Sequence, residues 1–84
     1  MFKFWYVYLI QSTKDNTIYT GITTDLNRRL KQHNTSKGAR YTKGRGPFIL
    51  IKYFKCQNKS QALKLEYKIK KLSREEKLKF QTLT

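Results

Sequence analysis

The sequence predicts an α+β fold in which a three-stranded antiparallel sheet is flanked by helices, in the order β-β-α-β-α-α. Three segments, 3–11, 17–22 and 48–56, are rich in the aromatic and β-branched residues that favour strands. Residues that commonly cap helices precede the segment between the second and third of these strands, and they also precede the segments that follow the third strand. Because 84 residues leave little room for a long parallel crossover, we expect antiparallel pairing within a single domain, residues 1–84.

The first two strands are expected to pair as a hairpin. Residues 3–11 carry apolar side chains on both faces, which is typical of a central strand covered by helices. Lys14, Asp15 and Asn16 provide turn chemistry, because Asp and Asn tolerate tight turns. The segment 17–22, rich in Thr, Ile and Tyr, completes the pair.

A first helix is expected to follow the hairpin. Thr23 or Thr24 is the expected N-cap, since a hydroxyl oxygen can accept a hydrogen bond from the first turn. Leu26, Leu30 and His33 recur at i, i+4 and i+7 and so share one face. The helix is therefore predicted to pack on the sheet through these three side chains.

Two further helices are expected after the strand 48–56. Asn58 or Ser60 is the expected cap of the longer one. Its inward side chains are predicted to be Ala62, Leu65, Ile69 and Leu72. Ser73 and Glu76 match a capping box, which predicts that a short last helix begins there.

The segment 34–47 has no apolar period and holds three of the four glycines and the only proline, so we interpret it as a mobile basic loop. The candidate nucleic-acid contacts are Arg28 on the preceding helix and four cationic side chains of the loop, Lys37, Arg40, Lys43 and Arg45.

The charge of the chain limits its partners. Nineteen Lys and Arg against five Asp and Glu give a net charge of +14, which a polyanion such as nucleic acid would neutralise. The alternatives are a basic surface that keeps the protein soluble, contact with an anionic membrane, and association with a ribosome. No segment pairs a bulky apolar face with a Lys-rich one, so membrane contact is not expected. Cys56, the only cysteine, is expected to be a buried thiol in a reducing cytoplasm.

Glu66 is the one acidic residue without an evident turn or capping role. It borders the inward face of the second helix. It could pair with Lys70 at i+4, which contributes a few tenths of a kcal/mol (~0.3). Alternatively, it could be the single carboxylate ligand of a hard divalent cation such as Mg²⁺, with water and phosphate oxygens as the other ligands.

Arg29 and His33 share a helix face at i, i+4. The guanidinium suits phosphate, and imidazole can carry a proton near neutral pH. The alternatives are a solvated arginine and a helix-terminal histidine favoured by the dipole. Tyr8 and Tyr19 could orient or deprotonate water, or could simply pack in the sheet. For Tyr6 we favour packing.

These residues together resemble the GIY-YIG nuclease family, in particular its small single-domain members. The resemblance covers nearly the whole chain. It rests on four segments: Tyr6-Val7-Tyr8, Tyr19-Thr20-Gly21, the helix from Arg28-Arg29 to His33-Asn34, and Ala62 to Glu66. The first triad has the bulky Tyr6 where the family pattern has glycine.

The resemblance implies a role for each of five residues. Tyr8 would help to organise the site, and Tyr19 would activate water. Arg29 would bind the phosphate and His33 would lie near it. Glu66 would hold the divalent metal, Mg²⁺ or Mn²⁺.

The resemblance implies a metal-dependent nuclease that cuts DNA, with structure or single-strand selectivity, in repair or recombination. The first alternative is a protein that binds DNA or RNA without cleaving it. The second is a ribosome- or RNA-associated protein. DNA is favoured over RNA as the partner.

Overall fold

The computed structural model describes residues 3–35 and 46–81 and confirms the α+β fold with the order β-β-α-β-α-α. The third strand has the expected bounds, and the ends of the first two strands differ from the expected ones by one or two residues, as element ends usually do. The strands are β1 Trp5–Ser12, β2 Ile18–Thr23 and β3 Phe48–Cys56. The helices are α1 Leu26–His33, α2 Lys59–Lys70 and α3 Arg74–Lys79.

The sheet has the strand order β2-β1-β3, and both pairings are antiparallel. The strand with two apolar faces, β1, is central, as the sequence predicted. Tyr8 lies opposite Gly21 on β2 and opposite Tyr53 on β3. Residues directly opposite one another share a face of the sheet, so these three lie on the same face.

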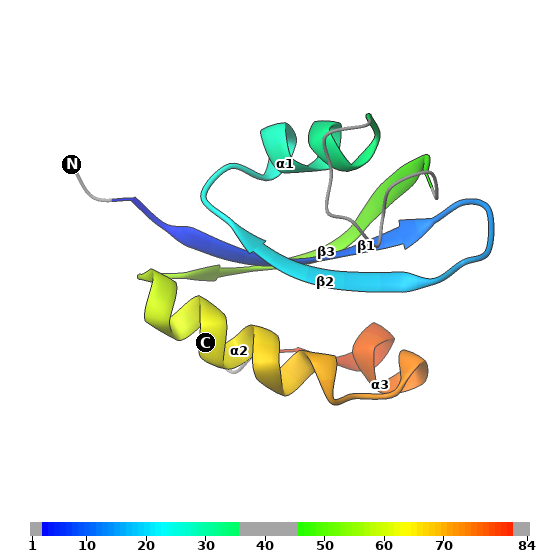
Figure 1. The fold of residues 1–84 in the computed structure, drawn as a ribbon. Coiled ribbons are helices and arrows are strands. Elements are labelled where there is room, and N and C mark those ends of the chain that lie inside the picture. Colours follow the sequence, from blue (N-terminus) through cyan, green and yellow to red (C-terminus); the bar gives the residue numbers. More distant parts are fainter. Residues whose placement is uncertain (1–2, 36–45, 82–84) are drawn as a thin grey trace.

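Helices cover both faces of the sheet: α1 lies on one side, and α2 and α3 lie on the other (Figure 1). Each layer has its own apolar core. On the α2 side the core includes Val7, Leu9, Ile18, Cys56, Ala62 and Ile69. On the α1 side Tyr8, Ile10 and Phe48 pack with Tyr19, Leu26, Leu30 and Leu50.

The N-cap of α1 is Asp25, so the prediction of Thr23 or Thr24 was wrong. The Asp25 carboxylate accepts a hydrogen bond from Arg28 N at 3.1 Å. Thr23 is still paired with Tyr6 in the sheet, which places it too early for the cap. Its hydroxyl accepts a hydrogen bond from Asp25 N at 3.1 Å instead.

Predictions for the caps of α2 and α3, the hairpin turn and the cysteine are confirmed. Asn58 caps α2, and the capping box of Ser73 and Glu76 starts α3. Asn16 has a positive φ of 63° in the hairpin turn. Cys56 is buried, which raises the pKa of its thiol.

Of the basic segment 34–47, only residues 34, 35, 46 and 47 are described. Lys37, Arg40, Lys43 and Arg45 lie outside the described residues. Across residues 3–35 and 46–81, no helix is long and apolar enough to cross a bilayer.

Candidate functional site

Three polar side chains meet on the α1 face of the sheet. Tyr8 Oη lies 2.8 Å from His33 Nε2, and Arg29 Nε donates to the same phenol oxygen at 3.3 Å. Arg29 also donates from Nη1 to Gln32 Oε1 at 3.0 Å, which fixes the guanidinium on the surface of α1. Strand β1 and helix α1 thus hold a cation, a phenol and an imidazole in one hydrogen-bonded row.

Gly21 makes room for this row. It lies directly opposite Tyr8 in the sheet, and a Cβ atom at residue 21 would fall 2.5 Å from Tyr8 Oη and 2.7 Å from Cζ. Real Cβ atoms do not approach other atoms so closely. Only glycine therefore lets the Tyr8 ring lie across β2 and reach α1.

His33 is only 3% exposed, and its pKa is lowered to about 4. Burial is the larger cause and the positive charge of Arg29 is the second. The imidazole is therefore neutral at neutral pH, and the helix-dipole interpretation, which requires an imidazolium, does not hold. Because Arg29 can only donate, we assign the Tyr8 oxygen as its acceptor and the Tyr8 proton to the bond with His33.

Phe48 and Asn34 fix the position of His33 from the side of β3. The Phe48 ring packs on His33 and on Tyr19, with centroids 6.0 Å and 5.6 Å apart, respectively. The Asn34 amide donates to Phe48 O at 3.2 Å, and its oxygen accepts from Phe48 N at 2.5 Å. This double hydrogen bond ties the end of α1 to the start of β3.

Glu66 lies on α2, on the other side of the sheet from α1 (Figure 1). Its Oε2 atom is 3.4 Å from Lys70 Nζ, and the Glu66 side chain is 18% exposed. The Glu66–Lys70 ion pair, which the sequence suggested as an alternative to metal binding, is thus present. Such a partly exposed i, i+4 pair contributes only about 0.3–0.5 kcal/mol.

The remaining four acidic residues have local partners. Asp15 accepts from Thr17 N, and Asp25 caps α1. Glu75 pairs with Lys79, and Glu76 belongs to the capping box.

A metal at Glu66 would have one protein carboxylate as its ligand. In the described part of the chain, no group of three His, Cys, Asp or Glu residues could hold a metal ion together. One carboxylate suits Mg²⁺, which keeps several waters and takes the rest of its ligands from phosphate oxygens. The chemistry of this single donor is therefore compatible with a hydrated Mg²⁺ or Mn²⁺ ion.

The structure brings Tyr8, Arg29 and His33 into direct contact and places Tyr19 on the same face, against Phe48. Sequence reasoning missed the roles of Gln32 and Asn34. Gln32 follows Arg29 at i+3, a spacing at which helical side chains interact, so it could have been found. The partner of Asn34 depends on how α1 meets β3, which no local pattern reveals.

Residues 4–79 match the family model described as the GIY-YIG catalytic domain. The chain belongs to the GIY-YIG family. Among GIY-YIG relatives, it is 51% identical over 74 residues to the UPF0213 protein OB0043 of Oceanobacillus iheyensis, covering 88% of this chain and 85% of that protein. It is 47% identical to the UPF0213 protein SH2523 of Staphylococcus haemolyticus, covering 88% and 89%, respectively.

A solved GIY-YIG relative has a similar fold. The solution NMR structure of the UPF0213 protein BH0048 from Bacillus halodurans superposes with a TM-score of 0.56 at 45% identity. The match covers 90% of this chain and 80% of that one. Family and fold thus agree with the resemblance carried by the four segments named from the sequence.

Proposed function

We propose that this GIY-YIG domain is a nuclease that hydrolyses phosphodiester bonds in DNA with the help of a divalent cation, Mg²⁺ or Mn²⁺. The observation that supports it most strongly is the row from Arg29 through Tyr8 to His33. In this row the Arg29 guanidinium, a group suited to phosphate, lies beside the Tyr8 phenol, and the phenol proton faces the neutral imidazole of His33. Membership of the GIY-YIG family supports the same reaction class.

In this proposal Arg29 holds the phosphate and stabilises its growing negative charge. Tyr8 takes a proton from the attacking water while its own proton passes to His33 Nε2. Since the charge of Arg29 is one cause of the lowered pKa of His33, a phosphate that neutralises Arg29 makes the imidazole a stronger base. Tyr19 helps to orient the water.

Glu66 is the proposed metal ligand. A divalent cation held by Glu66 would supply charge stabilisation for the leaving oxygen of a substrate that reaches from Arg29, on the α1 face, round to α2. Lys70 competes for the same carboxylate at 3.4 Å, and its side chain is half exposed. The pair is therefore weak enough for a dication to displace the ammonium.

The test is a cleavage panel with labelled single-stranded, duplex, flap and four-way DNA, and with matched RNA, in Mg²⁺, Mn²⁺ or EDTA. Wild type is expected to cut at least one DNA in metal and none in EDTA. Arg29→Ala and Glu66→Ala are expected to cut at least about a hundredfold more slowly, and Lys64→Ala on the outer side of α2 is the control. Cleavage by Glu66→Ala at the wild-type rate in matched Mg²⁺ would refute the metal assignment.

The second candidate function is nucleic-acid binding without cleavage. One observation favours it: Glu66 pairs with Lys70 on the helix that covers the face opposite Arg29 (Figure 1). This candidate predicts salt-sensitive binding, because many phosphates would be neutralised by Lys and Arg. It also predicts no metal-dependent cut in any substrate of the panel, whereas one specific cut refutes it.

A further inference from the structure

An aromatic surface lies next to the Arg29–Tyr8–His33 row on the same face of the sheet. Tyr53 of β3 is directly opposite Tyr8, and Tyr6 is two residues before Tyr8 on β1. The period-two alternation of strands puts all three side chains on one face. The rings of Tyr6 and Tyr53 meet edge to face, with centroids 6.0 Å apart and an interplanar angle of 69°.

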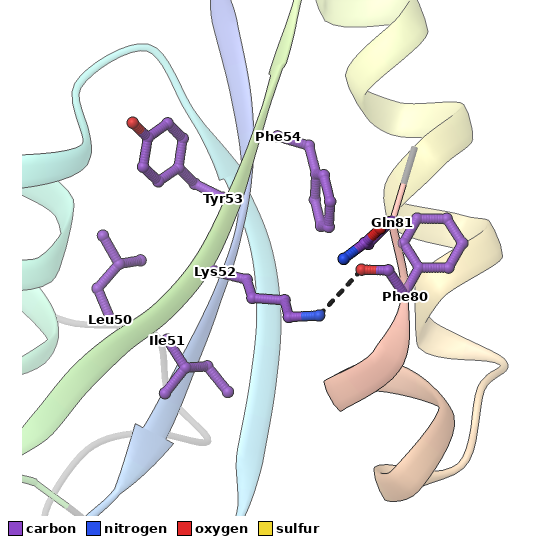
Figure 2. A pocket seen from close by; sticks show the side chains of 7 residues that line it. All are labelled: Leu50, Ile51, Lys52, Tyr53, Phe54, Phe80 and Gln81. Atoms are coloured by element: carbon purple, nitrogen blue, oxygen red, sulfur yellow. Dashed lines mark hydrogen bonds between the residues drawn. The ribbon is translucent and has the colours of Figure 1, made fainter. Parts of the chain in front are cut away.

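Tyr53 extends the site along the sheet. The Tyr53 and Leu50 side chains point to the α1 side of β3, whereas Lys52 and Phe54 point to the opposite side, toward Phe80 (Figure 2). Leu50 packs in the core beneath α1, but Tyr53 is 55% exposed. The helix therefore covers one part of this face and leaves the Tyr53 ring open to a ligand.

A lysine borders these rings. Lys55 lies opposite Tyr6 in the sheet, so its side chain also belongs to this face. Its Nζ lies 3.8 Å from the centroid of the Phe4 ring, and both side chains are exposed. An open tyrosine with a lysine two residues farther along the same face of the strand suits a base and its phosphate in single-stranded nucleic acids.

We propose that Tyr53, supported by Tyr6 and Lys55, is a stacking platform for an unpaired nucleobase next to the Tyr8–Arg29 cluster. The inference rests on the proposed nucleic-acid substrate and sharpens it, because it assigns an unpaired strand beside the reacting phosphate. The net charge of +14 favours a polyanion as the occupant, and the aromatic rings favour one that carries flat bases. Tyr6, the bulky residue at the glycine position of the first triad, supports the edge of the Tyr53 ring.

Binding is measured in EDTA, so that cleavage plays no part, by fluorescence anisotropy of labelled oligothymidylate and of a fully paired DNA hairpin. Tyr53→Ala is expected to weaken single-strand binding roughly tenfold, because one lost stack removes that much affinity. Hairpin binding is expected to change by less than about twofold, as for an ordinary surface substitution. Tyr53→Phe keeps the ring and should bind like wild type.

The matched control is Tyr67→Ala. Tyr67 is 65% exposed and has Lys71 Nζ 4.1 Å from its ring centroid, but it lies on α2. A loss at Tyr67 equal to that at Tyr53, or no loss at Tyr53, overturns the proposal. Circular dichroism checks folding, and Tyr53→Thr, which keeps strand propensity, replaces the alanine variant if that one unfolds.

Oligouridylate in the same assay tests RNA. If the affinity for either oligomer falls in Tyr53→Ala, the platform is supported. If the affinity for neither oligomer falls, the platform is overturned. The outcome is separate from the cleavage panel: a Tyr53-dependent protein that never cuts refutes the nuclease proposal alone. A cutting protein indifferent to Tyr53 refutes the platform alone.

Discussion

Gly21→Ala is the substitution with the clearest expected effect on the candidate site. The new Cβ would lie 2.5 Å from Tyr8 Oη and 2.7 Å from Cζ, so the Tyr8 ring must move. Gly21 has no positive φ that would add backbone strain, so the cost comes from crowding alone. Overpacking of this kind costs about 1–3 kcal/mol.

The displaced ring also loses hydrogen bonds. Tyr8 Oη can no longer lie 2.8 Å from His33 Nε2 and 3.3 Å from Arg29 Nε at once. The ring cannot keep both bonds, and the loss of one costs about 1 kcal/mol because His33 stays buried. We therefore expect the free energy of unfolding to fall by about 2–4 kcal/mol, and Tm to fall by about 10–25 °C for a domain of this size.

Thermal unfolding followed by circular dichroism measures this change. The comparison is Gly46→Ala, whose new Cβ would meet its nearest atom, Asn34 Oδ1, at 3.3 Å and should cost less. Adding Tyr8→Phe to Gly21→Ala removes the atom at 2.5 Å and should recover part of the stability. A Gly21→Ala protein as stable as wild type would contradict the packing described around Tyr8.

Two further predictions concern His33 and Asn34. Because the pKa of His33 is lowered to about 4, the unfolded chain binds a proton that the folded protein does not. The free energy of unfolding should therefore be fully retained above pH 6.5 and should fall by up to about 3 kcal/mol toward pH 4. Urea titrations measure this change, and wild type should lose stability more steeply with falling pH than His33→Gln. Asn34→Ala removes both bonds to the Phe48 backbone and should cost about 1–3 kcal/mol in the same titrations. Asn34→Asp keeps the oxygen that accepts from Phe48 N, so its unfolding free energy should lie between those of wild type and Asn34→Ala. Equal losses of unfolding free energy in the two variants would contradict the pair of hydrogen bonds.

The fold was largely predictable because its signals are local. The two apolar faces of β1 indicated a central strand, and the capping box at Ser73 marked the start of α3. The N-cap of α1 was missed because Thr23, Thr24 and Asp25 are all competent caps. The choice among them depends on where the chain leaves the sheet, and Thr23 is still paired with Tyr6.

The site was predictable only in part. The i, i+4 spacing placed Arg29 and His33 on one helix face, and the triads indicated Tyr8. The bond from Tyr8 to His33 joins residues 25 apart, and it depends on the sheet register that sets Gly21 opposite Tyr8. The neutral state of His33 depends on burial, which a sequence pattern does not give.

The electrostatics of the domain bear on how such a site works. Four of the five acidic residues serve turns, caps or a surface ion pair, and Glu66 has Lys70 beside it. The α1 face thus presents Arg29 with a phenol and a neutral imidazole. A phosphate placed beside Arg29 would oppose the smaller of the two causes that lower the pKa of His33, and would raise that pKa at the moment when a base is needed. In the proposed reaction, substrate binding and base strength are therefore coupled through the guanidinium of Arg29.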